Sequence, residues 1–498
     1  MNSSFCTASA LSFVTLALLL SACSVRPPAE PQLPFSLPDN FSAAPANSYT
    51  ASERWWGDFA DDELNRFVET ALVSNPGVAQ ALARTRIAEA RVRLNRGDQL
   101  PSVGIGLGST RQRQNLGNIA GPLADAAGDM TFISNNHNAA LDVSWELDLW
   151  GRLSALTASA RAEYLASAEQ LRGLRQSVSA QVVQMYFDIV HARAQVELSE
   201  RTVGTLEEMS RQIANRVDAG VASPADAMLA EANLGSAQAG LEQRREALER
   251  SLRQLEILLG QYPAGRLQTA SDLPGVPASP AAGIPAQLLE RRPDVRAAEL
   301  ALLGAGYQLG AAQRSFLPSL SLSGSAGYAG SQFSELFSSS NFVWSIGGQI
   351  LQPIFQGGRL RAQVDIAEGQ QSGALHAYTE AALNALSEVE SILAVETLLQ
   401  RREQTLDASA SAAEEAVRVS YNRYRQGIDP FLNVLESQQR ALDGRSAYIS
   451  ARLARIENRI ALHLALGGGF EDQPERAEQR SAGETAAPRM ISRTTRTP

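Results

Sequence analysis

Apolar side chains recur at alternating three- and four-residue steps through two long segments of the chain. The first segment, residues 151–217, contains no proline, and its stripe runs through Val182, Val196 and Val217. The second segment, residues 358–425, carries a similar stripe. This spacing predicts two very long helices with coiled-coil seams, each roughly 100 Å long. Because no globular core can bury such rods, they must pack against other long helices.

Short motifs repeat at matching spacings in the two halves. A Gly-Arg-Leu triplet opens each long segment, at residues 151–153 and 358–360. Upstream, a Leu-Pro-Ser triplet occurs at residues 100–102 and again at residues 317–319. In each half, a second proline lies 25 residues before the proline of the triplet. The Ala-rich stretch between those prolines predicts a helix of about six turns. The chain is therefore a duplication, with a first repeat over residues 53–259, a linker over 260–285 and a second repeat over 286–466.

After each Leu-Pro-Ser triplet, the apolar period changes from the helical value to the two-residue period of a strand. Four stripes result: Val103, Ile105 and Leu107; Leu141, Val143, Trp145 and Leu147; Leu320, Leu322 and Tyr328; and Phe342, Trp344, Ile346 and Ile350. We expect four strands of about ten residues, long enough to cross a bilayer at a tilt, each with an apolar outer and a polar inner face. Polar loops are expected at about residues 115–136 and 329–341.

Four strands cannot close a barrel, and lipid does not tolerate an open sheet edge. The chain must therefore oligomerise to complete its membrane domain. Two copies would give eight strands, whose lumen is filled by side chains, and three would give twelve, which can leave a channel. The polar inner face favours three. The predicted fold class is mainly α with a transmembrane β-barrel, built from a duplicated helix-strand-strand-long helix-helix unit.

Each long helix is followed by a glycine-containing turn, with Gly220 in the first repeat and Gly427 in the second. Glycine there predicts a left-handed C-cap, and the prolines that follow predict new helices over about residues 226–259 and 431–466. The chain reverses direction at both turns, and the two glycines are candidate hinges.

The N-terminus predicts a lipoprotein. Residues 1–22 contain an apolar run too short to span a bilayer permanently and end in small residues before Cys23, which matches a bacterial lipobox. The alternative is an incidental cysteine in an ordinary secretory leader. No basic residue precedes the apolar run, as it usually does in a signal peptide, so translation could start at a different codon. Proline-rich residues 23–52 predict an extended strap from the lipid anchor, and residues 467–498 predict a disordered tail.

Composition excludes several chemistries. All 44 basic residues are arginine, which rules out P-loop and Schiff-base lysines. The net charge of -9 argues against a nucleic-acid partner. The four histidines, His137, His191, His376 and His463, lack metal-ligand spacing. We therefore expect no enzyme activity, no metal site and no cofactor apart from a covalent lipid on Cys23.

These motifs together resemble a known family. The lipobox, a Trp-Trp-x-x-Phe opening at residues 55–59, Arg-Arg-Pro-Asp-Val at 291–295, both Leu-Pro-Ser triplets, both Gly-Arg-Leu triplets and both glycine turns resemble the TolC-like outer-membrane efflux factors, in particular the NodT-type lipoproteins. The resemblance implies a homotrimer in the outer membrane that extends into the periplasm, with a twelve-stranded barrel and a twelve-helix tunnel. It also implies a periplasmic membrane-fusion adaptor and an inner-membrane pump of RND type as partners.

The resemblance further implies a periplasmic gate at the turns. The matching positions are Tyr424, Asp429, Leu432, Asn433 and Glu436 in the second repeat and Asp226 in the first. The alternative is that the carboxylates only complement helix dipoles. If three chains bring Asp429 and Glu436 to the axis, crowding should raise the pKa of both carboxyls and favour bound cations.

The expected function is that of an outer-membrane channel in a tripartite efflux system, which conducts small molecules passively to the exterior. Two alternatives stay open: a channel for polypeptide secretion of type I, and a coiled-coil lipoprotein with no pore. Alternating strands argue against the second alternative, because a structural coiled coil has no use for an outward apolar belt.

Overall fold

The computed structural model describes residues 34–42, 54–115, 131–280 and 285–468. The predicted signal peptide, Cys23, most of the strap and nearly all of the predicted tail lie outside the described residues.

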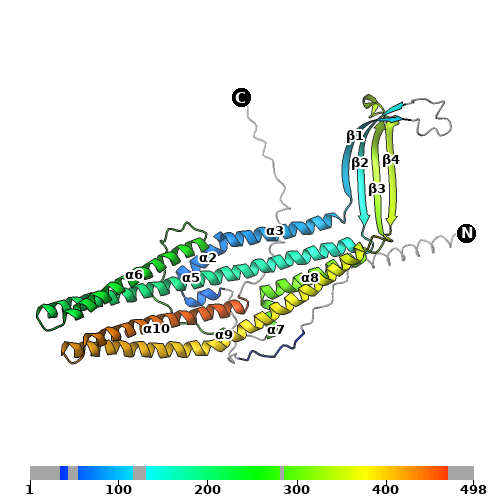
Figure 1. The fold of residues 1–498 in the computed structure, drawn as a ribbon. Coiled ribbons are helices and arrows are strands. Elements are labelled where there is room, and N and C mark those ends of the chain that lie inside the picture. Colours follow the sequence, from blue (N-terminus) through cyan, green and yellow to red (C-terminus); the bar gives the residue numbers. More distant parts are fainter. Residues whose placement is uncertain (1–33, 43–53, 116–130, 281–284, 469–498) are drawn as a thin grey trace, which may run out of the picture. The chain divides into compact units, whose positions relative to one another are not determined.

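The helices repeat in length and spacing between the two halves (Figure 1). The first half contains the 3₁₀ helix η1 (Trp55–Phe59) and helices α2 (Asp62–Ser74), α3 (Pro76–Gly97), α5 (Arg152–Asp218) and α6 (Pro224–Leu258). The second contains α7 (Pro285–Arg291), α8 (Pro293–Arg314), α9 (Arg359–Arg425) and α10 (Phe431–Ala465). Helices α5 and α9 each have 67 residues, and α6 and α10 each have 35. The two long helices and the returning helices are therefore confirmed. No helix in the described ranges combines the length and apolarity needed to cross a membrane.

Four antiparallel strands form one sheet in the order β1-β2-β3-β4. They are β1 (Ser102–Asn115), β2 (Thr131–Leu147), β3 (Ser319–Gly330) and β4 (Phe342–Leu351). The first two, with 14 and 17 residues, are longer than predicted. Residues 131–136, predicted as loop, are strand, because the polar end of β1 pairs with them from Arg111 to Asn115. The predicted loop over 329–341 contains two short 3₁₀ helices, η4 (Phe333–Glu335) and η5 (Ser339–Asn341).

Strand register places all four predicted apolar stripes on one face of the sheet. Ile105 is paired with Leu141, which is paired with Ala326, and Ala326 is paired with Trp344. The opposite face carries glycine, serine and charged residues, for example Gly104 beside Asp142. Because side chains alternate along a strand, this register divides the sheet into one apolar and one polar face.

The chain divides into two compact units that do not follow the sequence repeats. The first unit consists of Gln80–Leu171 and Asp294–Leu383, and it contains the sheet with the adjoining parts of the helices. The second consists of Leu37–Ala79, Arg172–Pro293 and the chain from Asn384 onward, and it contains both glycine turns. Each repeat therefore contributes to both units.

Aromatic side chains form a core in the second unit. Trp55 and Trp56 are buried. Trp55 stacks on His463, whose ring is fully buried, with centroids 5.1 Å apart. Phe59 packs on Phe187 at 4.8 Å. The Trp-Trp-x-x-Phe segment thus anchors the start of the first repeat to α5 and α10.

Residues 260–280 are irregular and are held by hydrogen bonds to the helices of the second unit. Arg193 of α5 donates to the carbonyls of Leu267 and Thr269 at 3.3 and 3.4 Å. The amide of Ala270 donates to the Tyr186 hydroxyl at 3.0 Å. These bonds satisfy backbone groups that the irregular conformation would otherwise leave unpaired.

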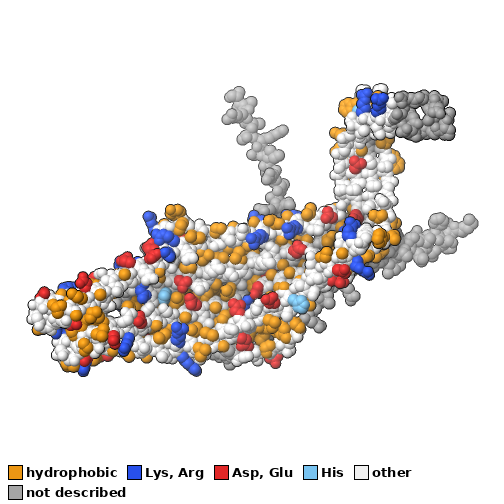
Figure 2. Space-filling view, viewed as in Figure 1, with side chains coloured by type: hydrophobic (Ala, Val, Ile, Leu, Met, Phe, Trp, Pro, Cys, Tyr) orange, Lys and Arg blue, Asp and Glu red, His pale blue; other side chains and the backbone are white. Residues whose placement is uncertain are grey.

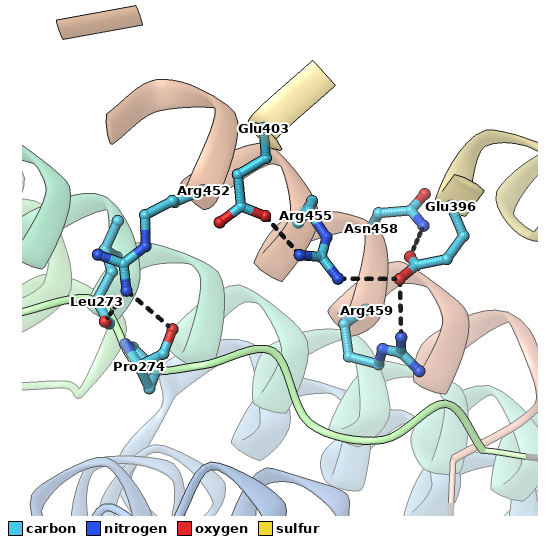
Figure 3. Close-up of polar contacts among 8 residues, drawn as sticks. All are labelled: Leu273, Pro274, Glu396, Glu403, Arg452, Arg455, Asn458 and Arg459. Carbon is cyan, nitrogen blue, oxygen red and sulfur yellow. Dashed lines mark hydrogen bonds and ion pairs between the residues drawn. The ribbon is translucent and has the colours of Figure 1, made fainter. Parts of the chain in front are cut away.

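An ion-pair network joins α10 to α9 in the same unit (Figure 3). The Glu396 carboxylate accepts hydrogen bonds from Asn458 at 2.8 Å and from Arg459 at 3.0 Å. Arg455 pairs with Glu403 and lies 3.8 Å from Glu396. One turn earlier on α10, Arg452 donates to the carbonyls of Leu273 and Pro274, so the same helix also holds residues 260–280 (Figure 3).

Candidate functional site at the helical turns

The two glycine turns have the same hydrogen-bonded geometry. Gly220 has φ +71° and Gly427 has φ +74°. In the first turn, the amide of Val221 donates to the Arg216 carbonyl at 2.9 Å, and in the second the amide of Ile428 donates to the Arg423 carbonyl at 3.0 Å. This is the Schellman arrangement, in which a left-handed residue satisfies the last carbonyls of a helix. The predicted left-handed caps are confirmed, and the hinge role stays a prediction.

A new helix begins directly after each turn. In the first repeat Pro224 is the first residue of α6, and the Ser223 hydroxyl accepts a hydrogen bond from the amide of Ala225 at 3.1 Å. In the second repeat Pro430 caps the N-terminus of α10 without a side-chain hydrogen bond. A proline at the first residue of a helix, or directly before it, has a fixed φ angle that is compatible with the helical conformation. Two helical hairpins result, α5 with α6 and α9 with α10.

Tyr424 lies inside a hydrophobic cluster that joins the two hairpins. Its side chain is 6% exposed, and its ring packs on Phe431 with centroids 5.2 Å apart. Met209 and Ile213 of α5, Ala230 of α6 and Val434 of α10 complete the buried part of this cluster. Tyr424 therefore holds one hairpin against the other within the chain.

The polar end of Tyr424 is buried without a hydrogen bond. Its hydroxyl has no hydrogen-bond partner among the described residues. The guanidinium carbon of Arg216 lies over the ring, 5.3 Å from its centroid. Burial raises the pKa of Tyr424, the negative charge of Asp226 raises it further, and Arg216 opposes both. Arg216 also donates to the Arg425 carbonyl at 3.4 Å, which adds a polar contact between the hairpins.

Asp429 is neutralised inside its own chain. Arg423 donates to both of its carboxylate oxygens, from Nε at 2.6 Å and from Nη2 at 3.1 Å. These bonds lower the pKa of the Asp429 carboxyl. The expectation that crowding raises this pKa concerns three assembled chains and stays a prediction, and within one chain the bidentate arginine acts in the opposite direction.

The remaining predicted gate residues are more exposed. Leu432 is 52% exposed, and Asn433 is also exposed. Glu436 is exposed and lies 3.4 Å from Arg440, one turn later on α10. Asp226 is half-buried and close enough to act on Tyr424 through its charge. The structure thus brings Tyr424 and Asp226 together and leaves Leu432, Asn433 and Glu436 at the surface of the chain.

Comparison with known proteins decides the family. A family model described as outer membrane efflux protein matches residues 67–261 and 284–468. The chain belongs to the outer membrane efflux protein family. It is 32% identical to the outer membrane protein OprJ of Pseudomonas aeruginosa over 93% of this chain and 96% of that protein. It is 30% identical to the probable efflux pump outer membrane protein TtgC of Pseudomonas putida over 96% of this chain and 99% of that one.

A solved structure with the same fold is the outer-membrane channel OprN. It has a TM-score of 0.81 and 28% identity, and the match covers 90% of this chain and 99% of that chain. The resemblance to TolC-like efflux factors and the predicted fold class are confirmed. This outer membrane efflux protein resides in the outer membrane and is the outer-membrane channel of an efflux system. As one component of that system, it works with partner proteins, and its relatives are efflux channels rather than enzymes.

Sequence reasoning missed two arginines in this efflux protein. Arg216 and Arg423 occupy the same position in the two turns. In each turn, the carbonyl of this arginine accepts the hydrogen bond from the amide five residues later that closes the Schellman cap. Their shared offset of 207 residues, the same as that of the two long helices, was visible in the sequence. Their different partners, a tyrosine ring and a carboxylate, depend on how each turn folds back.

The apolar face of the sheet is a second candidate functional surface of this efflux protein. Ile105, Ile346 and Ile350 on this face are between 72% and 83% exposed in the single chain. Aromatic residues border the face at the loop end, where Tyr328 contacts Phe337 at 5.5 Å and Phe342 at 5.6 Å. At the helix end, the indole of Trp150 donates to the Pro318 carbonyl at 2.7 Å. An apolar band between two aromatic borders is typical of strands that face lipid.

Proposed function

We propose that three copies of this chain join their sheets into one twelve-stranded barrel and conduct small molecules passively from the periplasm to the exterior. One observation carries the proposal: β1 and β4 are the edges of the chain's sheet, and both present apolar side chains on the same exposed face. Lipid contains no water to satisfy the backbone groups of an open edge, so β1 of one copy must pair with β4 of the next.

The polar face of the sheet favours a barrel whose interior is filled with water and not with packed side chains. Gly104, Gly106, Gly347 and several serines line that face, and such small side chains would leave the interior open. An eight-stranded barrel has an interior that side chains fill, whereas twelve strands enclose a wider space. Two copies would therefore close a barrel but leave little room for solute.

Crosslinking of the purified protein in mild detergent tests the oligomer. We expect a ladder that stops at three chains. A ladder that ends at two chains, or no ladder at all, would overturn the trimeric barrel. A conducting trimer in planar bilayers would also exclude the non-conducting coiled-coil lipoprotein, which leaves secretion of polypeptides as the alternative cargo.

Partners follow from the same proposal. We infer a periplasmic membrane-fusion adaptor and an inner-membrane pump of RND type, which fit a relative named as an efflux pump outer membrane protein. Co-purification of the crosslinked trimer with the pump encoded beside its gene tests this assignment. Recovery of an ATP-driven exporter in place of an RND pump would favour the polypeptide channel.

The turns are proposed as the periplasmic gate. The cluster around Tyr424 would hold the hairpins together in the closed state, and Gly220 and Gly427 would absorb the backbone change on opening. The adaptor would favour the open state through contacts that only that state offers.

We further propose that Cys23 carries the lipid. Acylation contributes about 0.8 kcal/mol per buried methylene, but a barrel holds the protein in the bilayer without it. The Cys23→Ser variant should therefore lose label from radioactive palmitate and still fractionate in part with the outer membrane. Undiminished labelling would refute lipidation of Cys23, and complete release as a soluble monomer would refute the barrel.

A further inference from the structure

We propose that Arg111 and Arg113 form a binding site for the phosphate groups of lipid A in the outer leaflet; this inference rests on the proposed outer-membrane barrel. Both arginines lie in β1, on the same face as Ile105 and Leu107. That face is the apolar one, so the two guanidinium groups extend the lipid-facing side of the strand and not its polar side.

The position of the pair along the strand fits a headgroup contact. Arg111 lies four residues beyond Leu107, which is about 14 Å along a strand and about 10 Å along the membrane normal at a tilt of about 45°. The headgroup layer is about 5–8 Å thick on each side of the hydrocarbon. Because arginine has a long flexible stem, its guanidinium can reach back into that layer.

The pair lies at the outer end of the sheet. At the other end the strands continue into α3, α5, α8 and α9, whereas the Arg113 end carries the connections between strands. The register also places the arginines beyond the aromatic border: Leu107 is paired with Ala139, and Ala139 with Tyr328. The outer leaflet is therefore the one these side chains meet.

The surroundings of the pair favour an anion. Arg111 is paired with Asn135 and Arg113 with Ile133, so no carboxylate lies directly opposite either one. Both are exposed, and neither has an ion-pair partner within the described ranges. Figure 2 shows positive side chains gathered at this end of the sheet, next to apolar ones. Between them on the polar face stands Gln112, so the charge is confined to the lipid side.

Phosphate is the anion that suits such a pair. A guanidinium presents a planar fork of donors that matches two phosphate oxygens. Lipid A carries its phosphates on the glucosamine disaccharide to which its acyl chains are attached, in the headgroup layer that the arginines can reach. A basic group near an anionic lipid surface contributes about 1 kcal/mol, so two per chain correspond to about a 30-fold change in affinity.

Native mass spectrometry of the purified, delipidated protein titrated with lipid A tests the site. We expect wild type to retain lipid A in preference to phosphatidylcholine, and the Arg111→Gln, Arg113→Gln double variant to bind it about 30-fold more weakly. The Arg111→Lys, Arg113→Lys pair keeps both charges but lacks the planar fork, so its affinity for lipid A should lie between those of wild type and the double glutamine variant. Arg401 and Arg402 are exposed on α9, and their double glutamine variant controls for the loss of two charges per chain.

The outcomes separate this inference from the proposed function. Equal affinity of wild type for lipid A and phosphatidylcholine would overturn the site, as would equal lipid A binding by wild type and the double glutamine variant. Crosslinking of the same samples reports the oligomer independently. A trimer without lipid A preference refutes only the site, whereas the absence of a trimer refutes the barrel on which it rests.

Discussion

Replacement of Tyr424 by alanine is expected to open the channel. A buried aromatic residue replaced by alanine costs about 3–5 kcal/mol. Tyr424 contacts both hairpins, but Phe431 belongs to its own hairpin, so that contact survives when the hairpins separate. Only the contacts with the other hairpin bias the closed state; they involve Met209, Ile213 and Ala230 of the cluster, and Arg216. We assign them about half of the total, roughly 2 kcal/mol per chain, or about a 30-fold shift toward the open state.

Single-channel recording in planar bilayers measures this shift. Wild type should conduct rarely, and the Tyr424→Ala variant should show frequent openings of larger conductance. The Tyr424→Phe variant should behave nearly like wild type, because it keeps the packing of the ring and loses only the weak interaction of the hydroxyl with Arg216. Tyr262 is 86% exposed, so Tyr262→Ala is a matched control that should leave conductance unchanged.

Two results would refute this reasoning. If Tyr424→Phe opened the channel as much as Tyr424→Ala, the closed state would depend on the hydroxyl and not on ring packing. If Tyr424→Ala conducted like wild type, the cluster would stabilise the fold without closing the channel.

Three further predictions concern the turns and the network. Arg423→Gln should strengthen block by divalent cations, because it frees the Asp429 carboxylate, whereas Asp429→Asn should not strengthen it; equal block in both would contradict the pairing. Glu396→Gln should lower stability by about 3 kcal/mol in thermal melts, because it leaves the 3%-exposed Arg459 without its charged partner, while Glu415→Gln at an exposed pair should change little. Gly427→Ala should cost about 1 kcal/mol through its φ of +74°, whereas Gly369→Ala inside α9 should stabilise; similar melting shifts would argue against the strained turn.

The long helices and the strands were predictable because their patterns persist. Helices α5 and α9 repeat their apolar spacing over 67 residues each, so local exceptions do not hide the period. The start of β2 was not predictable, because residues 131–136 alternate poorly and become strand only through pairing with β1. Pairing between strands is a long-range effect that a local pattern does not contain.

Positions at the turns were predictable, but side-chain partners were not. Gly220 and Gly427 are recognisable because few other residues adopt a left-handed cap. The pairing of Arg423 with Asp429 depends on that cap, which folds Ile428 back on the Arg423 carbonyl and brings residues six apart into contact. Burial of Tyr424 depends on the other hairpin, formed by α5 and α6, which contributes Met209 and Ile213 from more than 200 residues away.

Two groups in the second unit, the buried His463 and the half-buried Asp188, should make stability depend on pH in opposite directions. Burial, and then Arg459, lowers the pKa of His463 from 6.5 to about 4. Burial, and then Glu457, raises the pKa of Asp188 from 3.8 to about 6. Between pH 6.5 and 4 the unfolded chain binds more protons at His463 than the folded chain does. The free energy of unfolding of the protein therefore falls by about 3 kcal/mol through this group as the pH is lowered. The folded chain binds more protons at Asp188 between pH 6 and 4, which adds about 2 kcal/mol once solvent screening of a partly exposed group is included.

In wild type these opposing effects largely cancel, so single variants are needed to reveal them. His463→Phe keeps a ring against Trp55 but cannot titrate, and relative to wild type it should gain stability as pH falls from 6 to 4. Asp188→Asn removes the compensating group, so its melting temperature should fall more steeply than that of wild type over the same range. Exposed carboxylates titrate alike in all three proteins, so differences between the curves isolate His463 and Asp188. Parallel curves for the three proteins would mean that neither group is buried as the fold places it.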